Sequence, residues 1–439
     1  MKKAFRAALS AALSIALVCA FSMSYFAYAA NSGFVSFGSY VLNYSSSNNP
    51  TGVTITGYTG VLPSELNIPA SLDGHTVTKI GENAFSPNYS GCSIQKLSIP
   101  ASVTEIEDAG FAFCQSLTEV SFSEGLKIIG NFSFMSCSSL SAIALPASLE
   151  SISVSFAGCG LKTIIVSPRN LYFTAVDNVL FSKDMAVLYQ YPLGLCSTSY
   201  TMPDSVTEIA SASFGFSELQ KVQFSSNLEY IGINAFADSK IVSANFPASL
   251  KNIDMSAFSR CTDLKSAAFL SSDTVISEYA FNECNNFIIR GYKNSTAEAF
   301  ANSQSKTFKI IDTDNINLAL GVPVSSLTYE YSPSEYNVSV KDCYGAELTE
   351  TQTAGTGTKI SVKDLYGTTA AEKLVYVTGD INGDGAHDIN DYNTLIDAAI
   401  CRTQLPDNIA TLSVSDANGD GVIDFFDVAQ YDLYLNSLS

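Results

Sequence analysis

The stretch that decides the fold is IPASVTEIEDAGFAFCQSLTEVSF, residues 99–122, because the chain repeats its apolar pattern directly afterwards. Residues 122–145 read FSEGLKIIGNFSFMSCSSLSAIAL, with apolar residues at the same steps of 0, 4, 7, 12, 15, 18, 21 and 23. Slightly shorter copies follow around Phe156, Phe214, Phe236, Phe258 and Phe281, and Phe85 begins the series. Such a period predicts a solenoid in which each coil packs on its neighbours.

Each repeat predicts one short parallel strand. Segments such as LTEVSF (117–122) and LKTIIV (161–166) carry the strand, and a proline follows in IPAS, LPAS, MPDS or FPAS. Proline has no N–H for the ladder and therefore suits the end of a strand. The recurring Phe is expected to fill the core, with the rings stacked between neighbouring coils.

Six cysteines share one slot of the repeat: Cys92, Cys114, Cys137, Cys159, Cys261 and Cys284. As catalysts or metal ligands they would need histidine or a second cysteine at close spacing, which the repeats do not supply. The pattern therefore favours small buried thiols in a ladder.

These copies resemble the BspA-like leucine-rich repeats of bacterial surface and secreted proteins. The entrance (57–85) and the exit IIRGYKNSTAEAFANSQSKTFKII (288–311) are similar to that family's end segments, so the resemblance covers about residues 52–311. It implies an N-terminal cap at 30–75, a leucine-rich-repeat solenoid at 76–311, and recognition of proteins or surfaces without chemistry. Ser295 and Glu298 independently predict a capped helix in the exit.

One copy departs from the pattern. Residues 166–202 are longer than the others, and Asp177-Asn178 lies between two apolar runs. This pair predicts a hairpin insertion.

The first 29 residues predict a signal peptide, so the protein is expected to be secreted. Lys2, Lys3 and Arg6 precede an apolar run that ends in the small-residue pattern 27–29. Cys19 leaves a lipid anchor as the alternative. No other stretch approaches the length of a membrane span. The formal net charge of −19 argues against nucleic acid or an anionic membrane surface as partner.

Residues 312–378 predict a small β-module or spacer. The segments LTYEYSPSEYNVSVKD, TKISVKD and KLVYVTG alternate in the manner of strands, with the Gly-rich AGTGT between them. The expected role is to hold the two ends of the protein apart.

The C-terminal segment contains two acidic loops, GDINGDGAHDIND (379–391) and SDANGDGVIDFFD (415–427). A calcium loop needs oxygen ligands at positions 1, 3, 5, 7, 9 and 12, with Gly at position 6. The predicted ligands are Asp380, Asn382, Asp384, the Ala386 carbonyl, Asp388 and Asp391, then Asp416, Asn418, Asp420, the Val422 carbonyl, Asp424 and Asp427. Two Ca²⁺ ions are therefore expected, rather than merely acidic turns.

Each loop precedes a helix, and Asp replaces the usual Glu at position 12. Two loop-helix units at the C-terminus of an exported chain resemble a type I dockerin, here at 379–439. The resemblance implies an all-α module that binds a cohesin on a scaffold protein, in a cellulosome-like complex. The positions that match the family's recognition residues are Phe425, Phe426 and Leu433, with Ile389, Asn390 and Ile396 in the first unit. These residues depart from the common Ser-Thr and basic pattern, which leaves the partner class open, and one Phe could instead pack inward.

Two functions remain from the sequence. The first is a non-catalytic interaction protein, docked on a scaffold and presenting its repeats to a protein or surface ligand in a polysaccharide-degrading complex. The second is a carbohydrate-binding or glycan-hydrolysing component of the same complex. The chain has two His and no Trp, and no nucleophile or phosphate-binding motif, although a glycosidase needs only two carboxylates. Because the repeats leave no region of catalytic-domain size, no enzyme is expected. The predicted exposed strand residues are Gln95, Lys96, Ser98, Thr118, Glu119, Ser121, Gln220, Lys221 and Gln223. An aromatic patch could come only from Tyr172, Phe173, Tyr189 and Tyr191, for which core or hairpin packing is the expected use.

Overall fold

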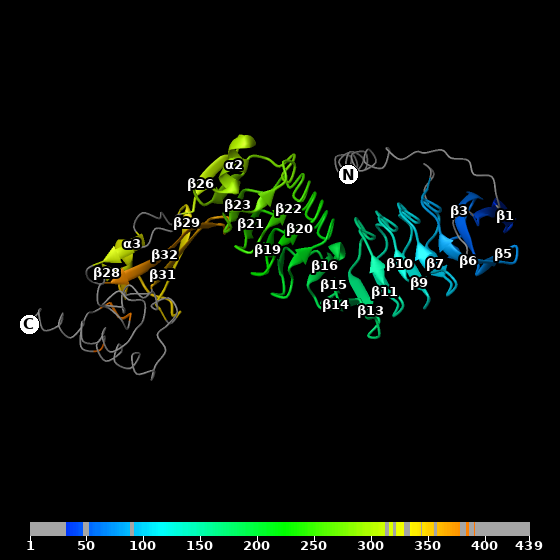
Figure 1. Cartoon of the computed structure of the whole chain (residues 1–439), viewed down its shortest axis with the longest axis horizontal. Helices are drawn as coiled ribbons and strands as arrows, with labels where there is room; N and C mark the ends of the chain where they lie inside the picture. Colours follow the sequence, from blue (N-terminus) through cyan, green and yellow to red (C-terminus); the bar gives the residue numbers. More distant parts are fainter. Residues whose placement is uncertain are drawn as a thin grey trace, which may run out of the picture.

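The fold is a long parallel β-solenoid followed by a small sheet. A computed structural model describes residues 32–46, 52–87, 92–311, 316–318, 322–328, 334–343, 345–354, 358–377, 383–385 and 390. The solenoid runs along the long axis of the molecule from β1 to α2, and β29, β31 and β32 continue beyond it (Figure 1).

Most coils of the solenoid contribute a long strand of three or four residues. These long strands are β4 (Glu65–Asn67), β7 (Lys96–Ile99), β9 (Glu119–Phe122), β11 (Ala142–Leu145), β13 (Thr163–Val166), β17 (Ser199–Thr201), β19 (Lys221–Gln223), β21 (Ser243–Phe246), β23 (Ser266–Phe269), β25 (Ile288–Gly291) and β26 (Thr307–Ile310). They form parallel sheets in the orders β4-β7-β9, β11-β13 and β17-β19-β21-β23-β25-β26. The parallel solenoid predicted from the repeats is therefore confirmed.

The expectation of one strand per repeat is wrong, because most coils carry a second, two-residue strand. These short strands are β8 (Glu105–Ile106), β10 (Ile128–Ile129), β12 (Ser151–Ile152), β18 (Glu208–Ile209), β20 (Tyr230–Ile231), β22 (Asn252–Ile253) and β24 (Val275–Ile276). Each pairs in parallel with its neighbours, as Ile129 does with Ile106 and Ile152. One inward residue and one outward residue suffice for this ladder, so no apolar run marks it in the sequence.

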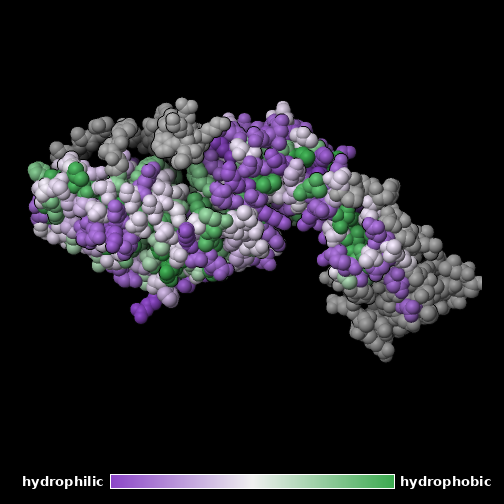
Figure 2. All heavy atoms as spheres, turned by 180° about the vertical axis from the view of Figure 1, so that it is seen from behind, coloured by the Kyte–Doolittle hydropathy of each residue, from purple (hydrophilic) through white to green (hydrophobic). Residues whose placement is uncertain are grey.

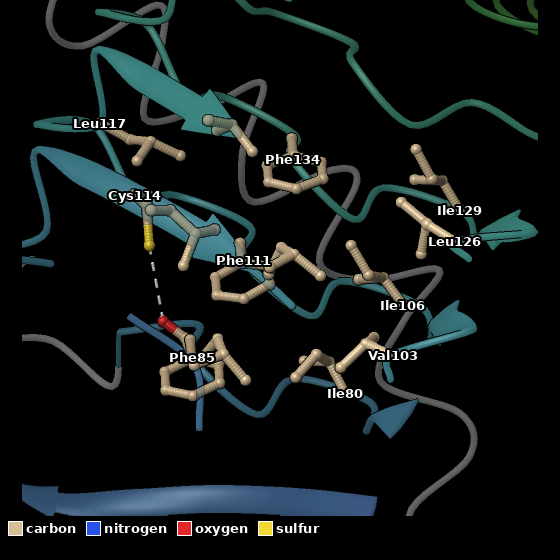
Figure 3. Close-up of a cluster of buried hydrophobic side chains, with 14 of the residues drawn as sticks. Ile80, Phe85, Val103, Ile106, Phe111, Cys114, Leu117, Leu126, Ile129 and Phe134 are labelled. Atoms are coloured by element: carbon tan, nitrogen blue, oxygen red, sulfur yellow. Dashed lines mark hydrogen bonds between the residues drawn. The ribbon is translucent and has the colours of Figure 1, made fainter. Parts of the chain in front are cut away.

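The core consists of stacked columns of equivalent side chains. In the first part of the solenoid the ring centroids are 4.9 Å apart for Phe85 and Phe111, 5.4 Å for Phe111 and Phe134, and 5.5 Å for Phe134 and Phe156. Figure 3 shows this column beside the column of Ile80, Ile106 and Ile129. Offset stacking of this kind adds to the burial of each ring.

The cysteines form the predicted buried ladder. All six thiols of the shared slot are buried and free. Each thiol after the first donates to the carbonyl of the Phe in the preceding coil, as Cys114 does to Phe85 at 3.6 Å and Cys159 does to Phe134 at 3.0 Å (Figure 3 shows the first). In these five coils the slot therefore holds a small group that donates one hydrogen bond to the preceding coil.

The long copy forms the predicted hairpin, which lies between two blocks of the solenoid. It contains β14 (Phe173–Val176), β15 (Val179–Ser182) and β16 (Val187–Gln190), with the turn of Leu193–Leu195 after them (Figure 1). Adjacent residues of β15 serve different cores, since Leu180 packs in the first block and Val179 and Phe181 pack in the second. We call this β14–β15 hairpin the wedge.

Both ends of the solenoid are closed by strands. The N-terminal cap contains β1 (Ser32–Ser36), β2 (Tyr40–Ser45), β3 (Val53–Gly60), β5 (Ser71–Leu72) and β6 (His75–Ile80). At the other end α2 (Thr296–Ser303) packs beside β26, and the Ser295 hydroxyl accepts from the Glu298 N–H. The Glu298 carboxylate in turn accepts from the Asn294 N–H at 2.6 Å. The predicted capped helix is confirmed.

Beyond the solenoid lies a four-stranded sheet of order β27-β32-β31-β29. Its strands are β27 (Ile316–Leu318), β29 (Tyr336–Lys341), β31 (Lys359–Asp364) and β32 (Thr369–Val377). The helix α3 (Val324–Thr328) and a separate two-stranded sheet of β28 (Val322–Pro323) and β30 (Thr353–Ala354) accompany it. Val340, Ile360, Val362 and Val375 belong to its own small core. Its described part forms a second lobe in the space-filling view (Figure 2). We call this sheet the C-terminal sheet.

Candidate ligand-binding surface

The long strands form three successive sheets, and we call the surface made by their outward side chains the strand face. In β7 and β9 the inward Leu97 and Val120 are buried, whereas the outward residues beside them are exposed. The prediction of exposed strand positions is confirmed for the whole set: Gln95, Lys96, Ser98, Thr118, Glu119, Ser121, Gln220, Lys221 and Gln223. Period-two alternation produces this result, because successive side chains of a strand point to opposite sides.

The strand face is polar and carries mixed charge at its N-terminal end. The Lys96 ammonium lies 3.7 Å from carboxylates of both Glu65 and Glu119, on the two neighbouring strands. All three side chains are more than half exposed, so these pairs add little to stability. The charged groups of these three side chains are therefore available to a ligand.

Small and apolar residues occupy the middle of the strand face. Ala142 and Ala144 are exposed on β11, and Ile165 on β13 is 56% exposed. Here the backbone of the strands lies close to the surface.

The C-terminal part of the strand face is covered by a turn of the C-terminal sheet. This turn, Asp364–Thr369, connects β31 to β32. The Asn245 side chain donates to the Gly367 carbonyl at 2.8 Å and accepts from the Thr369 N–H at 2.9 Å. The Ser266 hydroxyl lies 2.5 Å from the Thr368 hydroxyl.

An ion pair completes this contact. Arg290 Nε lies 3.2 Å from Asp364 Oδ2, and their side chains are 4% and 7% exposed. Burial by itself would raise the pKa of Asp364, but hydrogen bonds from Thr368 and Ser266 and the Arg290 charge outweigh it and lower the pKa. We call the contacts of Asn245, Ser266 and Arg290 with the turn the joint.

An acidic cavity of about 380 Å³ lies on the side of the short strands. Its lining includes Glu105, Glu107, Asp108 and Asn131. Lys79 lies 2.6 Å from Glu105 and 3.8 Å from Glu107, which offsets part of the charge. Burial raises the pKa of Glu107 above its ordinary value. Within the described ranges no cluster of three His, Cys, Asp or Glu side chains is arranged to hold a metal ion.

The aromatic residues of the insertion lie mainly in the core. Phe173 and Tyr191 are each 3% exposed. The rings of Phe173 and Tyr189 meet edge to face at 5.4 Å, and Tyr191 stacks on Phe214 at 5.2 Å. Tyr172 is 49% exposed and follows the 75% exposed Leu171. Packing is therefore the main use of this group, as the sequence favoured.

Most of the predicted calcium and cohesin-binding residues lie outside the described residues. Of the first loop the structure describes residues 383–385 and Asn390, and Asn390 is the one predicted recognition residue among the described ranges. Gly383 and Gly385 have positive φ angles of 81° and 83°, in the left-handed region that glycine adopts without strain. The two calcium sites and the cohesin contact stay predictions.

Sequence reasoning missed the residues of the joint. The solenoid residues involved, Asn245, Ser266 and Arg290, lie on strands whose pattern matches the other repeats. One weak signal existed, since β23 reads SAAF and places small residues at both outward positions. Asp364, in the turn that these residues contact, lies 74 positions after Arg290, and no periodic pattern links the two positions.

No helix in the described part of the chain is both long and apolar enough to cross a bilayer. His75, the histidine that the structure describes, is exposed on β6 with its ring 6.3 Å from Tyr44.

The chain was compared with curated proteins and with solved structures. No curated protein matches the chain. Among solved structures, a leucine-rich repeat protein from Eubacterium ventriosum is 19% identical, covering 66% of this chain and 88% of its own, with a TM-score of 0.44. A leucine-rich repeat protein from Bacteroides ovatus is 22% identical, with coverages of 66% and 77% and a TM-score of 0.39. A leucine rich cell surface protein from Faecalibacterium prausnitzii is 22% identical, with coverages of 62% and 98% and a TM-score of 0.28.

The family comparison covers more than half of the chain. The model of the BspA type leucine-rich repeat region, in six copies, matches residues 64–185 and 194–307. The interval between the two matches, residues 186–193, falls within the insertion that lies between the two solenoid blocks. The chain belongs to the BspA type leucine-rich repeat family.

Proposed function

We propose that this protein is a non-catalytic binding protein whose strand face recognises a protein or a surface ligand. One observation carries the proposal: the C-terminal part of this face already holds a polypeptide turn through side-chain and backbone hydrogen bonds. The outward residues of β7, β9 and β19 occupy equivalent positions on the ladder and are exposed. A surface that binds one turn in this way is suited to bind another.

We further propose that the C-terminal segment is a calcium-dependent dockerin. Support comes from the two acidic loops, in which Asp380 and Asp416 begin equivalent ligand sets. Such a module would attach the secreted chain to a cohesin-bearing scaffold, in a complex that degrades polysaccharides. The repeats would then present the strand face to the partners of that complex.

The test is a capture experiment on secreted proteins with the chain lacking residues 1–29. Ser121→Arg places a large charged side chain on the strand face. Ser151→Arg makes the same change at an exposed Ser of the short strand β12 and serves as the matched control. We expect Ser121→Arg to lower retention of a specific protein at least tenfold, while Ser151→Arg retains it.

A glycan array with the parent, Ser121→Arg and Ser151→Arg proteins tests the competing function, which is carbohydrate binding. Equal retention by all three in the capture experiment, together with glycan binding that Ser121→Arg does not alter, would contradict the proposal for the strand face. Removal of Ca²⁺ by a chelator should abolish capture of a cohesin without altering capture by the repeats.

A further inference from the structure

The strands β11 and β23 occupy equivalent positions in their repeats, but their outward residues differ completely in exposure. In β11, Ala142 and Ala144 are exposed. In β23, the equivalent Ser266 and Ala268 are both 0% exposed. The inward residues of both strands are buried in the same way, so the difference arises from what lies over β23.

The cover is the Asp364–Thr369 turn. It contacts three adjacent long strands through Asn245 on β21, Ser266 on β23 and Arg290 on β25. The parallel register brings Asn245 and Arg290 beside Ala268, one on each side. Ala268 is therefore enclosed by the polar contacts of the joint.

The turn is held in shape by its own hydrogen bonds. Asp364 accepts from the N–H groups of Tyr366 and Thr368, each at 3.0 Å, and from the Thr368 hydroxyl. The same carboxylate meets Arg290. One side chain thus organises the turn and fixes it to the solenoid. A satisfied buried network of this kind specifies a single arrangement.

We propose that this turn masks the C-terminal part of the strand face in cis. A partner in trans then binds the strands from β4 to β19 and reaches β21, β23 and β25 only after the turn is released. This inference rests on the proposed function of the strand face. It replaces the expectation of a spacer with that of a docked, self-covering element.

The experiment measures access to the strand face without any ligand. Ser266→Cys introduces a thiol under the turn, and Ser199→Cys introduces one in the same row of the ladder, on the exposed start of β17. Both variants are made in the chain lacking residues 1–29 and treated with a maleimide. Site-resolved mass spectrometry then gives a rate for each thiol. We expect modification at position 266 to be at least tenfold slower than at position 199.

Two further changes release the turn from opposite sides. Asp364→Ala removes the organising carboxylate. Asn245→Ala with Arg290→Leu removes two of the three solenoid side chains of the joint and leaves the turn unchanged. Either should bring the rate at position 266 to within about threefold of that at position 199. The buried thiols of Cys114 and Cys137 must stay slow, which shows that the solenoid itself remains folded.

Equal rates at positions 199 and 266 in the otherwise unchanged chain would overturn the proposal. It would also be overturned by a rate at position 266 that stays slow in both released variants. Neither result depends on whether the protein captures a partner, so a failure of the masking inference is distinguishable from a failure of the proposed function.

Discussion

Arg290 and Asp364 lie 74 positions apart in the chain, yet Arg290 Nε is 3.2 Å from Asp364 Oδ2 and both side chains are almost completely buried. Buried ion pairs are strongly destabilised when one partner loses its charge or is removed, because the other charge remains desolvated. The orientation of the C-terminal sheet therefore depends on the charge of one carboxylate.

This dependence predicts a loss of the joint at low pH. The folded pKa of Asp364 lies below the unfolded value of about 4, so its contribution is complete above that value and is lost as the pH falls through the folded pKa. The free energy of unfolding of the parent should exceed that of Asp364→Asn from about pH 5 to 7, and the difference should shrink as the pH falls below about 4.

Urea unfolding of both proteins across this pH range measures the difference. Glu372→Gln, which alters the exposed pair with Lys359, is the control and should differ little from the parent at any pH. A pH-independent difference for Asp364→Asn would contradict the assignment.

The Phe column predicts a large loss of stability for Phe134→Ala. Phe134 is 0% exposed and lies between Phe111 and Phe156 in the stack. Truncation of a fully buried Phe costs roughly 3–5 kcal/mol through lost burial and the resulting cavity. Urea unfolding measures it, and Tyr172→Ala, at a half-exposed ring of the same block, should cost less than about 1 kcal/mol. Equal losses of unfolding free energy from the two changes would show that the Phe column does not stabilise the core as proposed.

Ser217 occupies the slot of the ladder in which other coils have Cys. Its hydroxyl is buried, and among the described residues it has no hydrogen-bond partner. Because an unsatisfied buried hydroxyl is costly and a thiol is less polar, Ser217→Cys should stabilise the protein by about 1 kcal/mol. Thermal unfolding would show a rise of about 2–4 °C.

Ser239→Cys is the matched control for this change. The Ser239 hydroxyl lies 3.4 Å from the Cys261 thiol and thus already has a partner. The Ser239→Cys change should therefore increase stability less than Ser217→Cys does. A larger gain at Ser239, or a loss at Ser217, would contradict the explanation.

The sequence predicted the core because the core repeats. Within each block the buried Phe, Cys and Leu return at a nearly constant step, and stacking converts that step directly into a column. The bends beside each Phe were hidden, since the left-handed residues Ala109, Phe113, Ser136 and Ala212 are not glycines and carry no conformational signal. Position along the coil, rather than residue type, imposes those angles.

The joint could not be predicted for a different reason. Whether the Asp364–Thr369 turn meets Arg290 depends on how the C-terminal sheet leaves the last coil, which no local pattern encodes. The short strands were also missed, because their two residues are too few to show alternation.

Calcium should control the folding of the C-terminal segment. Residues 379–439 contain 11 Asp and one Arg, and a segment this small has a limited hydrophobic core. Carboxylates at 4 Å repel by about 1 kcal/mol per pair even in water. Binding at micromolar affinity would supply about 8 kcal/mol per site. The isolated segment should therefore be largely unfolded in chelator, whereas the solenoid should stay folded. Circular dichroism and thermal melts of the segment that do not respond to chelator would refute this.

Phe425 and Phe426 are predicted to form the scaffold contact. They lie off the expected core stripe of Val428, Tyr431 and Leu435. Two buried aromatic rings could supply several kcal/mol of affinity, so Phe425→Ser with Phe426→Thr should abolish capture by the cognate cohesin and leave two bound Ca²⁺. Ile389→Ser is the comparison and should matter much less. Calorimetry measures the cohesin affinity of both variants, and equal losses of affinity would exclude this assignment.

The wedge has a mechanical consequence for the whole protein. Within each block the coils share a continuous core, with ring columns from Phe85 to Phe156 and from Tyr191 to Phe281. Between the blocks the two cores meet at the hairpin, where Leu180 packs in the first and Phe181 in the second. Under a pulling force along the axis, the solenoid should part at this hairpin before any coil unravels. The protein would lengthen by one short step, and each block would keep its strands intact.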